Sequence, residues 1–302
     1  STSVPDGFNY SLQVDCTVID SSIGASQKCQ IQYTAEAQDC QLIKFGTSDA
    51  ETLTLAFWVK SNQTGQHSVA LQKRDNTQYC QPKTYTVSVA DTWEKKVLVF
   101  SALTTAGANI DVNNGSGLAI FWSLDAGTNL QGTADVWDES SESALAVSGD
   151  VSFMSSTSNN FYLTGVQLEV GTYTSSTIPP FRHESYGDSL QRCQRYYITY
   201  GYVGSVQDGY AGRAYSGTGM VWAVPLPRPL RASPTVTLTG TLRAFGYNAT
   251  FDSTSALGVY SYGNTNSSMI TLNSTGFSSL ANDTIYNVVP INDCLITLSA
   301  EL

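Results

Sequence analysis

Apolar and polar residues alternate along several stretches of the chain, which are separated by clusters of Gly, Asn, Asp and Ser. In the stretch Leu53–Lys60, the residues Leu53, Leu55, Phe57 and Val59 share one side of a period of two. Because successive side chains of a strand point to opposite faces, this alternation predicts a strand. The alternation is repeated in Thr84–Val89 and Gly117–Leu124, and two further strands of the first block are predicted at Trp93–Phe100 and Phe161–Val170. Short strands joined by turns predict a β-sandwich or jelly roll.

The pattern returns after residue 198, in a block rich in Thr, Ser, Asn and Tyr. Four prolines lie within residues 225–234, so this segment is expected to be extended or at a sheet edge rather than in a central strand. Strands are predicted on both sides of it: Met220–Pro225, Ser233–Leu242, Leu257–Tyr262, Met269–Leu272, Ile285–Val289 and Cys294–Leu298. They predict a second, smaller β-sandwich.

A proline-containing segment separates the two blocks. The pair Pro179-Pro180 lies within residues 171–185 and prevents a helix from passing through this point. We therefore expect an all-β protein with three parts. These are an N-terminal jelly roll or β-sandwich over residues 1–180, a linker with a short helix over residues 181–198, and a smaller C-terminal β-sandwich over residues 199–302.

The linker helix is predicted from its capping residues and from one narrow apolar face. Asp188 and Ser189 are good N-cap residues, and Leu190, Cys193 and Tyr197 follow at spacings of i, i+3 and i+7. About three turns of helix are marginal in isolation, so this face is expected to pack against something. The packing partner would be either the chain's own sandwich or the same helix in other copies of the chain. Leu190, Cys193 and Tyr197 are therefore candidate oligomer contacts.

Charge excludes some classes of partner. Of the 302 residues, 13% are charged, and the net charge is −10. Nucleic-acid binding usually needs a basic stripe, and the basic runs Lys95-Lys96 and Arg228–Arg231 are too short for one. Arg192 and Arg195 are expected on the open side of the linker helix. No run of eighteen apolar residues occurs, so we expect neither nucleic-acid binding nor membrane insertion.

Histidine and cysteine give no pattern for a cofactor or a catalytic centre. The two histidines, His67 and His183, have no Cys, His or Asp nearby at metal-ligand spacing, and no nucleotide-binding or hydrolase motif occurs. No cofactor is expected. The six cysteines are interpreted as buried free thiols, with disulfides among the first four as the alternative, at positions 16, 29, 40, 80, 193 and 294.

One acidic cluster has a composition suited to work on a sugar. Asp135, Asp138, Glu139 and Glu142 surround Trp137, and two carboxylates with a stacking indole can cleave a glycosidic bond. Spacing alone does not place two carboxylates across a bond, so a solvated loop with its Trp tucked into the sandwich is the preferred interpretation. The cluster also lacks the regular ligand spacing of a calcium loop, so structural calcium has no motif to support it. We expect no enzymatic activity.

Aromatic residues are the candidate binding groups. Trp58 lies on the face of its strand opposite Phe57, where an exposed ring would serve as a platform for a sugar or a protein. Cover by a loop or a neighbouring subunit is the commoner arrangement. Trp137, Tyr210 and Tyr215 complete the candidate aromatic platform, with packing inside the fold as the alternative.

Several segments resemble virion proteins of bacteriophages. They are TGVQLEVG (Thr164–Gly171), HESYGDSLQRCQRYY (His183–Tyr197), PLRASPTVT (Pro229–Thr237), the terminal SAEL (Ser299–Leu302) and, earlier, AFWVK (Ala56–Lys60). The chain looks similar to tail-fibre or tail-tip proteins in which a jelly roll like a carbohydrate-binding module precedes a small C-terminal β domain.

The resemblance implies a structural virion protein on the tail or capsid surface. Such a protein would be tail-fibre-like, homotrimeric, in contact with other virion proteins, and involved in adsorption to host-surface glycans. No catalytic residue is carried over. A capsid fibre or decoration protein is the alternative, and a depolymerase that cleaves surface polysaccharide through the acidic cluster is the second alternative.

Overall fold

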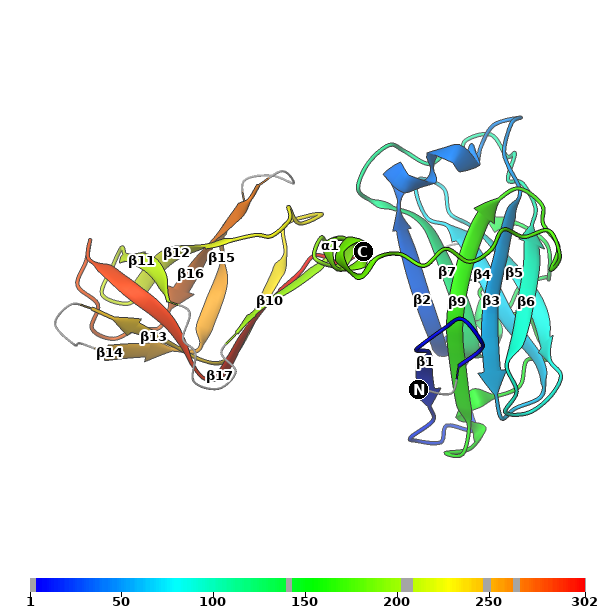
Figure 1. Ribbon diagram of the computed structural model, residues 1–302, viewed down its shortest axis with the longest axis horizontal. Helices are drawn as coiled ribbons and strands as arrows, with labels where there is room; N and C mark the ends of the chain where they lie inside the picture. The colour runs from blue at the N-terminus through cyan, green and yellow to red at the C-terminus, as the bar shows by residue number, and fades with distance from the viewer. Residues whose placement is uncertain (1–3, 140–142, 202–208, 247–250, 263–266, 302) are drawn as a thin grey trace. The chain divides into compact units, whose positions relative to one another are not determined.

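The computed structural model describes residues 4–139, 143–201, 209–246, 251–262 and 267–301. Contacts divide the chain into two compact units, with the boundary between Arg182 and His183. Nearly all regular structure in both units is antiparallel β-strand (Figure 1). The all-β fold class predicted from the sequence is therefore confirmed.

The first unit is a β-sandwich of two antiparallel sheets (Figure 1). In order of pairing, one sheet contains β1 (Leu12–Asp15), β9 (Asn160–Val170), β3 (Leu53–Ser61) and β6 (Glu94–Phe100). The other contains β2 (Lys28–Glu36), β7 (Ser116–Ala126), β4 (Gly65–Lys73), β5 (Tyr79–Val87) and β8 (Asp138–Glu139). Three short 3-10 helices lie in the connections, at Ala37–Ile43, Thr128–Leu130 and Phe153–Ser155.

The core of the first unit has an aromatic centre. Phe57 of β3 is fully buried and meets Tyr85 of β5 and Trp122 of β7 edge-on, with ring centroids 5.2 and 5.8 Å apart. Edge-to-face pairs at this separation add to the free energy gained from burying the rings. The predicted alternation in β3 is confirmed, because the same core contains its other inward residues, Leu53, Leu55 and Val59.

Part of the connection from β7 to β9 covers the outer face of the five-stranded sheet. Ala144 and Leu145 are buried there in a cluster with Phe121 of β7. The Asp135 N–H donates to the Pro82 carbonyl of β5 at 2.9 Å and fastens the cover to the sheet. Most of β4 is consequently buried on both faces, including the polar side chains of Ser68 and Gln72.

Residues 171–182 cross the outer face of the four-stranded sheet (Figure 1). The Tyr173 N–H donates to Thr54 Oγ1 at 3.0 Å, and Gln167 Nε2 donates to the Pro179 carbonyl at 3.1 Å. Ile178 is buried in this segment. These contacts attach the segment 171–182 to the first unit, so most of the predicted linker, residues 181–198, belongs to the second unit.

The second unit is built on one eight-stranded antiparallel sheet. The pairing order is β14-β13-β17-β11-β12-β16-β15, and β10 also pairs with β17. Strands β13 and β15 lie near opposite ends of this order and yet contact each other. The sheet therefore curls around its own core. The strands are β10 (Tyr197–Gly201), β11 (Tyr210–Ala214), β12 (Gly219–Pro225), β13 (Thr235–Phe245), β14 (Phe251–Thr254), β15 (Ala256–Ser261), β16 (Met269–Thr275) and β17 (Ile285–Ser299).

Strand β17 runs through a position where the sequence predicted a break. The stretches Ile285–Val289 and Cys294–Leu298 were predicted as two strands, and the structure joins them through Pro290. On one side β13 accompanies β17 along most of its length, while on the other β11 pairs only as far as Val288 and β10 begins at Leu295. Pro290 lies in the gap between these two partners, where a missing N–H breaks no pairing with either of them.

Helix α1 (Tyr186–Cys193) is shorter than the predicted linker helix, and this changes its apolar face. Ser185 is its N-cap, because its Oγ accepts the Asp188 N–H at 3.1 Å and donates to Asp188 Oδ2 at 2.7 Å. The helix ends at Cys193, and Tyr197 is already the first residue of β10. The prediction that Tyr197 shares a helical face with Leu190 was therefore wrong, since the helix is too short to include it.

Candidate functional site

A hollow of about 400 Å³ lies in the second unit between α1 and the proline-containing segment 226–231. From the helix side it is lined by Asp188, Gln191 and Arg192, which share one face because they lie three and four residues apart. Arg195 follows just after the helix, and Arg228 and Pro229 line the opposite side. The hollow therefore brings together three arginines that lie apart in the sequence.

Backbone hydrogen bonds hold the two sides of the hollow in place. The Arg231 N–H donates to the Arg195 carbonyl at 2.9 Å, and the Arg231 guanidinium donates to the carbonyls of Ala300 and Glu301 at 2.9 and 2.8 Å. The Arg228 guanidinium donates to Gln191 Oε1 and so connects the segment to the helix. The lining residues are thus positioned by contacts that no ligand has to supply.

The charge of the hollow is opposite to that of the chain. Among the described residues of the lining, three arginines and one aspartate give two more positive than negative charges, whereas the whole chain carries −10. Arg192 is paired with Glu184 at 3.1 Å, in an exposed ion pair of a kind that contributes little to stability. At the start of the helix, Asp188 Oδ2 accepts a hydrogen bond from the Ser185 hydroxyl, and the Asp188 N–H donates to Ser185 Oγ. The arrangement favours an anion in the hollow.

The sequence pointed only partly to this site. Arg192 and Arg195 were expected on the open side of the helix, and Arg228 was set aside because its basic run is short. The signal available was a polar stripe, Asp188, Gln191 and Arg192, at helical spacing. What the pattern could not show is that the segment around Arg228 folds back against that stripe.

Trp58 lies on the outward face of β3 and is half-buried. A Cβ added at Gly165 would approach the Phe8 ring to 2.6 Å and the Trp58 ring to 3.0 Å, so both rings rest against this glycine. Phe8 in turn meets Phe181 edge-on at 5.1 Å. The indole is accordingly bordered by the N-terminal segment of its own unit and is only partly accessible as a platform.

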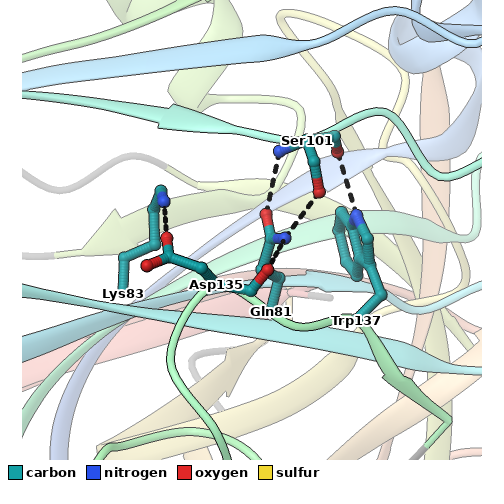
Figure 2. A network of polar contacts seen from close by, with 5 residues as sticks. All are labelled: Gln81, Lys83, Ser101, Asp135 and Trp137. Atoms are coloured by element: carbon teal, nitrogen blue, oxygen red, sulfur yellow. Dashed lines mark hydrogen bonds and ion pairs between the residues drawn. The ribbon is translucent and has the colours of Figure 1, made fainter.

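Trp137 is half-buried at the edge of the core, within a polar network (Figure 2). Its indole N–H donates to the Ser101 carbonyl at 2.9 Å, and its ring meets Phe45 edge-on at 5.5 Å. Gln81 Nε2 donates to Ser101 Oγ at 2.6 Å and to the Asp135 carbonyl at 2.9 Å. These contacts fix the loop to the sandwich.

The acidic residues near Trp137 do not all face one another. Asp135 is ion-paired with Lys83 (Figure 2), whereas Glu139 accepts a hydrogen bond from the Tyr79 hydroxyl at 3.1 Å. Asp138 lies in the short strand β8, and Glu142 lies outside the described residues. Asp135 and Glu139 are thus engaged with separate partners.

The two candidate tyrosines of the second unit have different surroundings. Tyr210 is half-buried and packs on Trp222 at 5.4 Å and on Tyr200 at 6.5 Å, within the core of the unit. Tyr215 is 42% exposed, and its hydroxyl donates to Asn273 Oδ1 at 3.0 Å. Of the two, only Tyr215 presents much surface to a ligand.

The candidate oligomer contacts are all exposed in the single chain. No residue of α1 is buried, Leu190 is 40% exposed, and Cys193 is exposed at the helix end. Tyr197 is 47% exposed on β10. All six cysteines are free, and only Cys193 among them is exposed.

His67 is buried inside the first unit, in strand β4. Its imidazole stacks on Tyr85 with centroids 5.6 Å apart, and its Nε2 lies 3.4 Å from the Gln63 carbonyl. Burial lowers the pKa of His67, the Gln63 carbonyl opposes this, and the positive charge of Lys96 adds to it. The folded unit therefore keeps this histidine neutral.

We expect the stability of the first unit to decrease as the pH falls below about 6.5, where His67 becomes protonated in the unfolded chain. Folding must remove that proton because the folded-state pKa is lowered. Urea unfolding at pH 7.5 and 5.5 measures the effect. His67→Gln should show a smaller loss over this interval than the wild type, and equal losses in the two proteins would contradict the prediction.

Among the described residues, no three His, Cys, Asp or Glu side chains are grouped so that they can hold a metal ion. None of the helices in the described ranges is long and apolar enough to cross a membrane.

No protein-family model matches the chain, and no curated protein matches it. A solved structure of the N-terminal CBM22-1–CBM22-2 tandem domain of Xyn10C from Paenibacillus barcinonensis is similar, with 10% identity and a TM-score of 0.29 over 100% of this chain and 83% of that chain. A protein from Parabacteroides distasonis has 11% identity and a TM-score of 0.22 over 96% and 89%. Neither likeness is close enough to bear on function.

Proposed function

We propose that the protein is a bacteriophage virion protein of the tail-fibre type that contributes to attachment to glycans on the host surface. It would be a homotrimer that contacts other virion proteins and has no enzymatic activity. The observation that carries the proposal is the resemblance of Thr164–Gly171 and His183–Tyr197 to phage tail proteins.

The positions of these motifs support the proposal. Thr164–Gly171 supplies most of β9, while His183–Tyr197 contains α1 and the first residue of β10. The motifs therefore coincide with the elements on either side of the boundary between the two units. This placement is expected if the chain resembles the phage tail proteins in its order of domains as well as in short sequence motifs.

The surface of the second unit supports a role in recognition. Exposed Tyr215 and the arginine-lined hollow offer a ring and several hydrogen-bond donors, the groups that fix polar ligands in binding sites. The net charge of −10 works against indiscriminate adhesion to anionic cells, so contact through particular groups is favoured.

Immunogold labelling of virions that carry this chain tests the proposal. An antibody raised against the purified protein should place gold on the tail. Gold confined to heads would support the capsid decoration protein instead, and particles without gold would overturn a virion role. A second measurement, fluorescent protein binding to host cells before and after periodate oxidation of their glycans, tests recognition: equal binding would exclude a glycan receptor.

A further inference from the structure

We propose that the hollow between α1 and residues 226–231 binds an acidic saccharide through its carboxylate or phosphate group. The guanidinium groups of Arg192, Arg195 and Arg228 would surround that group. This inference rests on the proposed role in glycan recognition, and it adds the class of glycan and the place where it binds.

The donors in the hollow match the shape of an oxyanion. A guanidinium presents planar N–H donors in a fork that meets two oxygens of a carboxylate or phosphate at once. Arg228 has five such donors, and Gln191 Oε1 accepts from this guanidinium within the lining. Arg192 and Arg195 add donors from the helix side.

Electrostatics give the hollow a preference for negative charge. Three positive side chains line one space and repel one another, and Asp188 in the lining and Glu184 beside Arg192 are negative charges close to them. An anion in the hollow would relieve that repulsion. In a chain with a net charge of −10, this local excess of positive charge is contrary to the overall balance.

The size and lining of the hollow favour a saccharide over a bare ion. A volume of about 400 Å³ lies within the range of small-molecule sites, far above what one phosphate ion fills. Besides the arginines, the lining contains the amide of Gln191, the carboxylate of Asp188 and the ring of Pro229. An amide and a carboxylate can bond sugar hydroxyls, and a proline ring can contact the apolar face of a sugar.

The positions of the arginines are set before any ligand binds. The hydrogen bond from the Arg231 N–H to the Arg195 carbonyl joins the two sides, and the Tyr262 hydroxyl donates to the Leu230 carbonyl at 2.9 Å behind the segment. Burial raises the pKa of Tyr262, whereas its hydrogen bond to Leu230 and the positive charge of Arg195 oppose the rise. Such preorganisation reduces the entropy lost on binding.

Calorimetric titration of the full chain tests the inference with four probes: oligogalacturonate, glucose 6-phosphate, a neutral malto-oligosaccharide of matched length, and inorganic phosphate. At least one acidic saccharide should bind, and binding should weaken as salt is added. Arg228→Gln should weaken it about tenfold or more, because a charged hydrogen bond is lost. Arg228→Lys should recover only part of the loss, since a lysine ammonium lacks the planar fork.

Arg213→Gln is the matched control. Arg213 is an exposed arginine of the same unit, on β11, and is ion-paired with Asp283. This substitution removes the same charge, so it should leave affinity unchanged within about twofold if the hollow itself is the site. Far-UV circular dichroism and melting temperature identify any variant that has lost its fold.

Three results would overturn the inference. They are equal weakening by Arg228→Gln and Arg213→Gln, equal affinity for the neutral and acidic saccharides, and affinity for inorganic phosphate as high as that for both acidic saccharides. None of these results would contradict the proposed virion role. That role would be overturned by a different result, the absence of gold label from the particles.

Discussion

Replacing Phe57 with alanine is expected to make the first unit melt well below its normal temperature while the second unit melts as before. Phe57 is fully buried, and its ring is fixed edge-on between Tyr85 and Trp122. Removing a buried phenylalanine costs about 3–5 kcal/mol through lost transfer free energy and an unfilled cavity. In a unit of this size, the melting temperature should fall by roughly 6–20 °C.

Differential scanning calorimetry separates the two units if each has its own transition. Only the transition of the first unit should respond to Phe57→Ala, because the two units have separate cores. Tyr10→Ala is the control: this aromatic side chain of the same unit is 77% exposed, so its loss should change stability by less than about 0.5 kcal/mol. A single transition that moves as a whole would show that the units unfold together.

Strands were predictable where large apolar residues recur at every second position. Strand β3 shows this pattern although nearly all of it is buried, and β9 lies within one residue of its predicted bounds. Strand β4 was missed because it is rich in polar residues, and the cover segment with Ala144 and Leu145 buries its outer face, so even Ser68 and Gln72 are inaccessible. Local sequence cannot reveal burial produced by a segment about seventy residues further along.

The candidate site was harder to predict than the fold, for a related reason. Each arginine of the hollow has an ordinary local context, and only the contact of residues 226–231 with α1 joins them. Two aromatic candidates were conspicuous in the sequence but are poorly accessible in the structure. Trp137 and Tyr210 stand out in the sequence, yet both are half-buried and engaged with neighbours in their own unit. Side-chain type indicates what a residue can do, while long-range contacts decide whether it is accessible.

Leu190→Asp is expected to convert the proposed homotrimer to single chains without lowering the melting temperature of either unit. On α1, Tyr186, Leu190 and Cys193 are spaced by four and three residues, so they share a face, and all three are exposed in the single chain. If that face joins copies of the chain, a carboxylate would have to be buried without a partner. This costs on the order of 4 kcal/mol or more, enough to weaken association about a thousandfold.

Sedimentation of the full chain over a range of concentrations measures this effect. Leu42→Asp is a suitable control, because Leu42 is a 75% exposed leucine of the first unit, outside the helix. The control should keep the mass of the wild type, while Leu190→Asp should give the mass of one chain. An unchanged oligomer in both variants would remove the α1 face from the interface. A lower melting temperature with unchanged mass would show that α1 packs within its own chain, contrary to its exposure.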